Sequence, residues 1–207
     1  MKKEFYYFAV AVFYCSALAS AQQYATTDEG KRVLLKDNGL WEIVVEEEAF
    51  GGSPVYFSKS PKSKQAVKGK LIPYEIWYSN EKWTVLGKSE NSLAEYTLKH
   101  KDGDVMAAVV AERIQVDLDK LVEIALNNLK NSASEYRIVD WKNATINNNV
   151  GKLLRINAIV QGIDFTYLIF YFSNERGSFQ LMTFTSNNLF ADYEKDLMEL
   201  ISGFVIN

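Results

Sequence analysis

The chain of 207 residues contains one cysteine and one histidine, and this scarcity excludes several chemistries. Cys15 lies within the first 21 residues, which we expect to be removed. Without it the chain has no disulfide framework, no thiol nucleophile and no cysteine-based zinc site. A single imidazole leaves few ways to build a catalytic dyad. That residue, His100, is the last of a predicted strand beside the turn KDGD, and we interpret it as an ordinary surface residue.

Motifs for nucleotide and hydrolase chemistry are also absent from the sequence. It has no G-x-S-x-G, no phosphate-binding loop and no histidine spacing typical of a metal site. The turn KDGD holds Asp102 and Asp104 but lacks the acidic repeat of a calcium loop. We therefore predict no metal and no cofactor.

The chain has no excess of positive charge. It carries 23 basic and 26 acidic residues, a formal net charge of −3 at pH 7, whereas nucleic-acid-binding domains are typically basic. We predict no nucleic-acid partner. The stretch KSPKSKQAVKGK is a local exception, with five lysines and no acid. It would attract an anionic envelope polymer, or form a solvated connector, and we favour a flexible linker over residues 48–70.

Residues 1–21 have the pattern of a signal peptide. Two lysines precede the apolar run FYYFAVAVFYCSALA, and Ala19 and Ala21 supply the A-x-A positions of a cleavage site. The run is shorter than the roughly 20 apolar residues of a spanning helix. Cys15 follows two aromatic residues, where a lipidation site has small ones. We predict cleavage after Ala21 and an exported protein, periplasmic or secreted, that begins at Gln22 without a membrane span.

The stretch KRVLLKDNGLWEIVV predicts a β-hairpin within an N-terminal segment of residues 22–47. A two-residue loop would pair Lys36 with Trp41, and a three-residue loop would pair Leu35 with Trp41. A slip of one residue moves every side chain to the other face of a strand. Only the longer loop gathers the apolar residues, so we predict that register, with Gly39 left-handed and Trp41 packed inward. The apolar face then holds Val33, Leu35, Trp41 and Ile43.

Residues 71–207 alternate between strand and helix patterns. PYEIWY predicts a strand, and AEYTLKH and DVMAAVVAERI predict a hairpin. DLDKLVEIALNNLKN has apolar residues at helical spacing, which predicts a helix with Asp117 as its N-cap. Three or four long strands follow, in which FTYLIFYF is apolar on both faces and belongs at the centre of the sheet. A last helix runs from about Leu189 to Ile201, with Gly203 as its C-cap. We predict an α+β fold, an antiparallel meander packed with two helices.

This order of elements resembles the Mog1/PsbP-like α/β/α sandwich over residues 71–207. YSNEKWTV is similar to a Tyr-x-x-x-x-Trp opening of related bacterial domains. Such domains mostly act as binding or assembly factors, so the resemblance implies a binding function. GKRVLLKDNGLWEIV resembles a short segment near the start of exported bacterial proteins, although Asn-Gly-Leu-Trp replaces the usual Asp-Gly-Thr-Trp.

A few side chains are candidates for ligand binding. Trp77 shares a strand face with Glu75, a placement that allows its ring to lie at the surface, and exposed rings stack on sugars or peptides. In the alternative interpretation the tryptophans cover the sheet edge or anchor the hairpin. Glu112 ends an apolar run and, if it points inward, needs a partner such as Arg155. The candidate ligand-binding residues are Trp77, Trp83, Trp141, Glu112 and Arg155.

Two functions from different classes fit these patterns. The favoured one is an exported, non-catalytic binding or assembly domain for an envelope protein or glycan. The alternative is a hydrolase that uses acidic residues, because paired carboxylates need neither histidine nor cysteine. Glu75, Glu112 and Asp140 are its candidates. A pair of carboxylates about 5 to 10 Å apart would favour the enzyme, and an exposed aromatic patch would favour binding.

Overall fold

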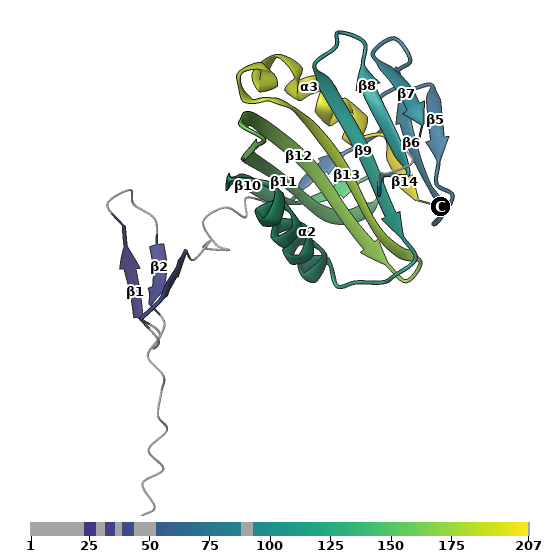
Figure 1. Ribbon diagram of the computed structural model, residues 1–207. Helices are drawn as coiled ribbons and strands as arrows, with labels where there is room; N and C mark the ends of the chain where they lie inside the picture. Colours follow the sequence, from purple (N-terminus) through teal and green to yellow (C-terminus); the bar gives the residue numbers. More distant parts are fainter. Residues whose placement is uncertain (1–22, 28–31, 36–38, 44–52, 88–92, 207) are drawn as a thin grey trace, which may run out of the picture. The chain divides into compact units, whose positions relative to one another are not determined.

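The computed structural model describes residues 23–27, 32–35, 39–43, 53–87 and 93–206 (Figure 1). These residues form two compact units, which meet in the sequence between Glu46 and Glu47. The predicted signal peptide and Cys15 lie outside the described residues. Of the helices within the described ranges, none has the length and hydrophobicity needed to cross a membrane.

The N-terminal unit is a three-stranded antiparallel sheet of β1 (Gln23–Thr26), β2 (Arg32–Leu35) and β3 (Trp41–Ile43). Leu35 pairs with Trp41, and Gly39 has a φ of 79°, as the three-residue loop requires. The predicted register is confirmed, whereas the packing of the Trp41 side chain lies outside the described residues. Strand β1 was not predicted, and it supplies the third strand that an isolated hairpin lacks.

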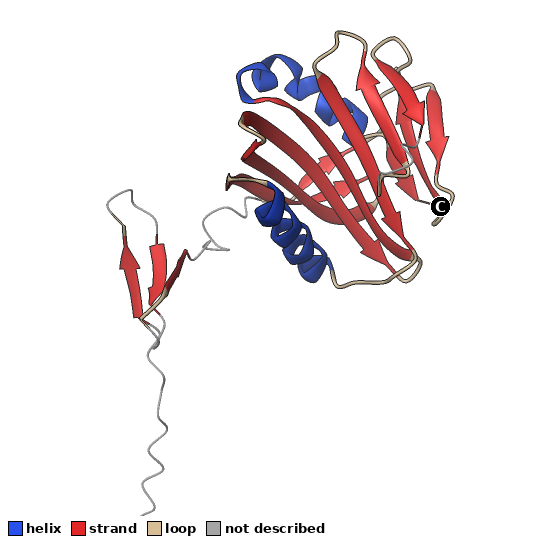
Figure 2. Ribbon diagram, in the orientation of Figure 1, coloured by secondary structure: helices blue, strands red, loops and turns tan. Residues whose placement is uncertain are grey.

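The second unit is built on an eight-stranded sheet (Figure 2) with the strand order β4-β10-β11-β12-β13-β9-β8-β7. The short edge strand β4 runs parallel to β10, and all the other neighbours are antiparallel. The strands are β4 (Val55–Phe57), β7 (Trp83–Gly87), β8 (Tyr96–His100), β9 (Val105–Glu112), β10 (Glu135–Ile146), β11 (Asn149–Val160), β12 (Ile163–Asn174) and β13 (Gly177–Ser186).

Helix α2 (Leu118–Ser132) packs on one face of this sheet. The other face is covered by α3 (Phe190–Ile201), which follows a 3-10 turn, and by a small sheet of order β14-β6-β5. The predicted α+β architecture of an antiparallel meander with two helices is confirmed. The strands of the small sheet are β5 (Gln65–Lys68), β6 (Tyr74–Tyr78) and β14 (Phe204–Ile206).

Residues 48–70, which we expected to form a flexible linker, contain β4 of the large sheet and β5 of the small sheet. Val55 and Phe57 of β4 pack against the main core, and Val67 of β5 is buried. Lys64 and Lys68 remain exposed beside it. The structure differs from the linker expectation because single apolar residues between lysines are enough to anchor short strands.

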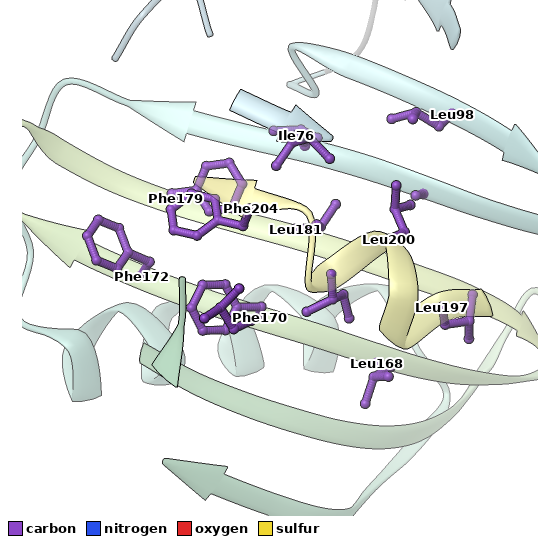
Figure 3. Packing of buried hydrophobic residues seen from close by; sticks show 14 of the residues in the cluster. Ile76, Leu98, Leu168, Phe170, Phe172, Phe179, Leu181, Leu197, Leu200 and Phe204 are labelled. Atoms are coloured by element: carbon purple, nitrogen blue, oxygen red, sulfur yellow. The ribbon is translucent and has the colours of Figure 1, made fainter. Parts of the chain in front are cut away.

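The main core lies between the large sheet, α3 and the small sheet (Figure 3). Phe204 stands at its centre, with its ring centroid 4.5 Å from that of Phe179 and 5.3 Å from that of Phe170. The preceding Gly203 is not the C-cap that we predicted, because α3 is capped by Ser202. Gly203 instead lets the chain approach β6, where its carbonyl accepts a 2.9 Å hydrogen bond from the N–H of Trp77.

A second core lies under α2. Leu121 of the helix packs with Ile169 and Tyr171 of β12, whose neighbouring residue Phe170 points into the main core. Strand β12 is therefore central and covered on both faces, as predicted. Asp117 caps α2, since its carboxylate accepts the N–H groups of the first turn at 3.0 and 3.3 Å.

Candidate binding surface

Trp77 lies on the outer face of the small sheet, together with Glu75, as the strand pattern predicted. Its Nε1 donates a 2.8 Å hydrogen bond to Glu75, and Lys59 Nζ lies 3.8 Å from the ring centroid. Glu75 also forms a 3.2 Å ion pair with Lys68. The indole N–H and one ring face are thus occupied by neighbours from the same chain.

The other two tryptophans are less accessible to a ligand. Trp83 is only 2% exposed, so its ring is not available for stacking on a ligand, and the alternative interpretation of a covering ring applies to it. It opens an edge strand, but its side chain points into the main core. Trp141 is half-buried against the α2 core, and Lys152 Nζ lies 4.8 Å from its ring centroid.

Glu112 and Arg155 do not form the pair that we considered. They lie on opposite faces of the large sheet, and β11 and β9 are three strands apart, about 14 Å. Glu112 is exposed, whereas Arg155 places its guanidinium carbon 4.1 Å from the ring centroid of Phe190. Strand alternation predicts which residues of one strand share a face of the sheet, but it does not predict which face other elements cover.

The three carboxylates considered for hydrolysis are also separated. Glu75 belongs to the small sheet, and Asp140 and Glu112 lie on β10 and β9 of the large sheet. Four strand spacings lie between the last two, about 19 Å, which exceeds the roughly 5 to 10 Å between the carboxylates of glycosidases. Asp140 forms a 3.0 Å ion pair with Lys142.

His100 is buried rather than exposed, so our surface interpretation is wrong. It is 3% exposed, and its ring lies between Trp83 and Tyr193, at centroid distances of 5.1 and 5.3 Å. Nδ1 accepts a 3.3 Å hydrogen bond from the backbone N–H of Asp102. Nε2 lies 3.3 Å from a carboxylate oxygen of Asp196, without the alignment of a hydrogen bond. No local pattern predicts this burial, because a charged turn follows His100 directly.

Lys82 extends this cluster and ties α3 to the start of β7. Its Nζ lies 2.7 Å from Asp196 and 2.5 Å from Glu199. Burial lowers the pKa of Lys82, but hydrogen bonds to both carboxylates outweigh it and leave the pKa raised. Burial raises the pKa of Glu199, but hydrogen bonds from Lys82 and Ser60 leave it lowered. Both shifts favour the charged forms, so the cluster is an ionic anchor for α3.

The best candidate for a binding surface lies on the α2 side of the large sheet. Helix α2 packs on β10, β11 and β12, and within the described part of the second unit Figure 1 shows no other helix or strand over β13 and β9 on that side. Apolar side chains from three strands stand there, and each is partly exposed. We call this surface the open face, formed by Met106, Val110, Phe165, Tyr167, Met182 and Phe184.

Three aromatic rings organise the open face. Phe184 lies 5.4 Å from Tyr167 and 5.9 Å from Phe165, measured between ring centroids. Met106 of β9 and Tyr167 of β12 pair with Phe184 from its two sides. Burial raises the pKa of Tyr167, so its hydroxyl is neutral near pH 7. The centre of the surface is therefore apolar and uncharged.

Fold and surface together define an α/β/α sandwich with a partly uncovered sheet. No protein-family model and no curated protein matches the sequence. Among solved structures, the chain is similar to cyanobacterial PsbP (CyanoP) from Synechocystis, with a TM-score of 0.55 and 12% identity over 72% of this chain and 95% of that one. It is also similar to LpqN from Mycobacterium tuberculosis, with a TM-score of 0.51 and 13% identity over 69% of this chain and 90% of that one. The second unit therefore has a PsbP-like fold, as the order of its elements predicted.

Proposed function

We propose that this chain is an exported, non-catalytic binding module of the cell envelope, and that its open face holds an apolar segment of a partner protein. The observation that carries the proposal is the group of partly exposed aromatic and methionine side chains on a sheet that α2 covers incompletely. Monomeric proteins rarely expose large continuous apolar patches, and those that exist often serve as interaction sites.

The chemistry of the open face favours a protein segment over a glycan. Methionine side chains are flexible and polarisable, and they suit surfaces that adapt to apolar partners. Sites for small ligands contain a few polar groups placed to fix the orientation of the ligand. On the open face, Gln180 borders the apolar centre, opposite Val110. Lys99 and Glu112 stand at its margins on β8 and β9, and both are exposed.

Two further observations support export to the envelope. The first 21 residues have the charge, length and A-x-A pattern of a cleaved signal peptide. LpqN, one of the structural neighbours, is described as involved in cell envelope biogenesis. N-terminal sequencing of the exported protein should begin at Gln22. Recovery of an uncut membrane form, or of a lipid-modified Cys15, would contradict export by this route.

The binding proposal can be tested with a phage library of random dodecapeptides. We expect selected peptides to be rich in apolar and aromatic residues and to lose affinity at least tenfold with Phe184→Asp or Met106→Glu. Both residues are partly exposed, so the variants should fold. Val150→Asp is the control, because Val150 is 64% exposed and lies outside the open face. Its affinity should match the wild type.

Two outcomes would overturn the assignment of the open face to a partner protein. One is a library that yields no peptide sensitive to Phe184→Asp. The other is a wild-type dimer in analytical ultracentrifugation that Phe184→Asp dissociates, since the occupant would then be a second copy of the chain.

A further inference from the structure

Two arginines, Arg137 and Arg155, lie on the α3 side of β10 and β11, away from the open face. Arg137 pairs with Asn157 across the two strands, and Arg155 lies two residues from Asn157 on the same face of β11. The arginines are therefore diagonal neighbours, with Cα atoms roughly 7 to 8 Å apart. Among the described residues, neither forms an ion pair.

Arg155 is held in place by stacking rather than by a carboxylate. Its guanidinium carbon lies 4.1 Å from the ring centroid of Phe190, a buried residue at the start of α3. Its Nε is buried without a hydrogen-bond acceptor in the described part of the chain. Half-buried charges are usually paired, because removing them from water is unfavourable. Here the charge is positioned and left unneutralised.

The acid nearest in register does not neutralise Arg155. Asp140 stands opposite it on β10, but its carboxylate lies 3.0 Å from Lys142 Nζ. Of the other acids on this face, Glu135 lies two residues before Arg137 on β10, and Asp164 of β12 lies beyond it, opposite Ile159. This face thus holds three cations, Arg137, Arg155 and Lys142, and two nearby acids, Asp140 and Glu135. Among the described residues neither acid forms an ion pair with an arginine.

Amide groups adjoin the two arginines. The hydroxyl of Thr166 lies 3.0 Å from Asn157 Oδ1 and 2.7 Å from Asn187 Oδ1. A hydroxyl has one proton to donate, so one of the two amides must turn its NH₂ group toward Thr166 and present its oxygen elsewhere. Asn157 lies opposite Arg137 and two residues from Arg155 on the same face, so its amide is placed to contribute a hydrogen bond beside the two arginines.

We propose that Arg137, Arg155 and Asn157 form a subsite for an oxyanion, a carboxylate or phosphate group of a small ligand. The forked guanidinium matches such groups with two parallel hydrogen bonds, which charge strengthens. Arg155 supplies a fixed fork and Arg137, which is exposed, supplies a mobile one. This site is additional to the open face and does not depend on it.

Anion titrations followed by NMR test the subsite directly. Inorganic phosphate and succinate, each added at constant ionic strength against chloride, distinguish the two kinds of oxyanion. We expect at least one of them to give saturable shifts of the amides of residues 155–157 and 187–190 and of the Arg155 Nε–H signal. The anion with the higher affinity identifies the group that the subsite prefers.

Charge-matched variants make the test specific. Arg155→Met should weaken binding at least tenfold, and so should Arg137→Met, which alters an exposed side chain and should leave the fold intact. Lys130→Met, an exposed cation on α2, removes the same charge and should bind within about twofold of wild type. Shifts that do not saturate with either anion, or equal affinities for Arg137→Met and Lys130→Met, would overturn the subsite. Neither arginine variant should affect peptide binding at the open face.

Discussion

Lys82→Met removes the cation that anchors α3, and we expect it to destabilise the second unit by about 2 to 3 kcal/mol. Lys82, Asp196 and Glu199 have side chains that are 28%, 23% and 14% exposed. Breaking a fully buried ion pair costs about 3 to 5 kcal/mol, because the remaining charge has no partner. Partial exposure reduces that figure, since water screens the remaining carboxylates. For a domain of this size the loss corresponds to a fall in Tm of about 5 to 10 °C.

The effect should depend on pH in a defined direction. The pKa of Glu199 in the folded protein lies below its ordinary 4.5, so its contribution to stability is present above pH 4.5 and is lost as the pH falls through the folded pKa. The pKa of Lys82 is raised above 10.5, so its contribution is present below pH 10.5 and is lost as the pH rises through the folded pKa. The difference between wild type and Lys82→Met should therefore be largest near neutral pH and should narrow in acid.

Urea denaturation followed by circular dichroism, at pH 7 and at about pH 3, measures this difference. Lys120→Met is the matched control, because Lys120 and Glu123 form an ion pair whose side chains are 59% and 58% exposed. Exposed pairs contribute little, so this control should change stability by less than about 0.5 kcal/mol. The ionic anchor would be refuted if Lys82→Met changed the free energy of unfolding by a similarly small amount at pH 7. It would also be refuted if the difference between wild type and variant were larger in acid than at pH 7.

Three more substitutions test other parts of the fold. Gly203→Ala should lower stability by about 2 kcal/mol or more in thermal denaturation, because a Cβ there overlaps the carbonyl oxygen of Trp77. Asp117→Ala should cost about 1 kcal/mol and speed amide exchange in the first turn of α2, whose N–H groups lose their cap. His100→Ala should cost about 3 kcal/mol, because it empties a buried site beside Trp83, and should leave peptide binding intact. A change within about 0.5 kcal/mol at any of these sites would contradict its assigned role.

Local patterns predicted the parts of the fold that local chemistry determines. The four long strands after α2 and the two helices follow from alternation, helical spacing and the cap at Asp117. The register of the N-terminal hairpin follows from a single requirement, that apolar side chains share a face. Each of these features depends on residues close together in the sequence.

Long-range packing explains what the sequence did not reveal. Strand β14 is three residues long. It forms because Phe204 packs into the main core and because Gly203, which has no side chain, lets β6 approach closely enough for a backbone hydrogen bond. His100 is buried because α3 brings Tyr193 and Asp196 over it from far along the chain. The Arg137–Arg155 juxtaposition depends on the β10–β11 register. A bulge between Ile138 and Asp140 shifts that register by one residue, and no sequence motif predicts this bulge.

The open face shows how one sequence pattern can have two structural outcomes. Strands β9 and β12 both carry apolar residues on both faces, but only β12 is covered twice. An α-helix with its side chains is about 10 Å wide, and strands are about 4.8 Å apart, so α2 can cover only two or three strands of the eight. The apolar residues of β9 and β13 on that side therefore contribute less to the core than the sequence pattern indicates. Their partial exposure is the basis on which we propose that a partner binds at Phe184 and its neighbours.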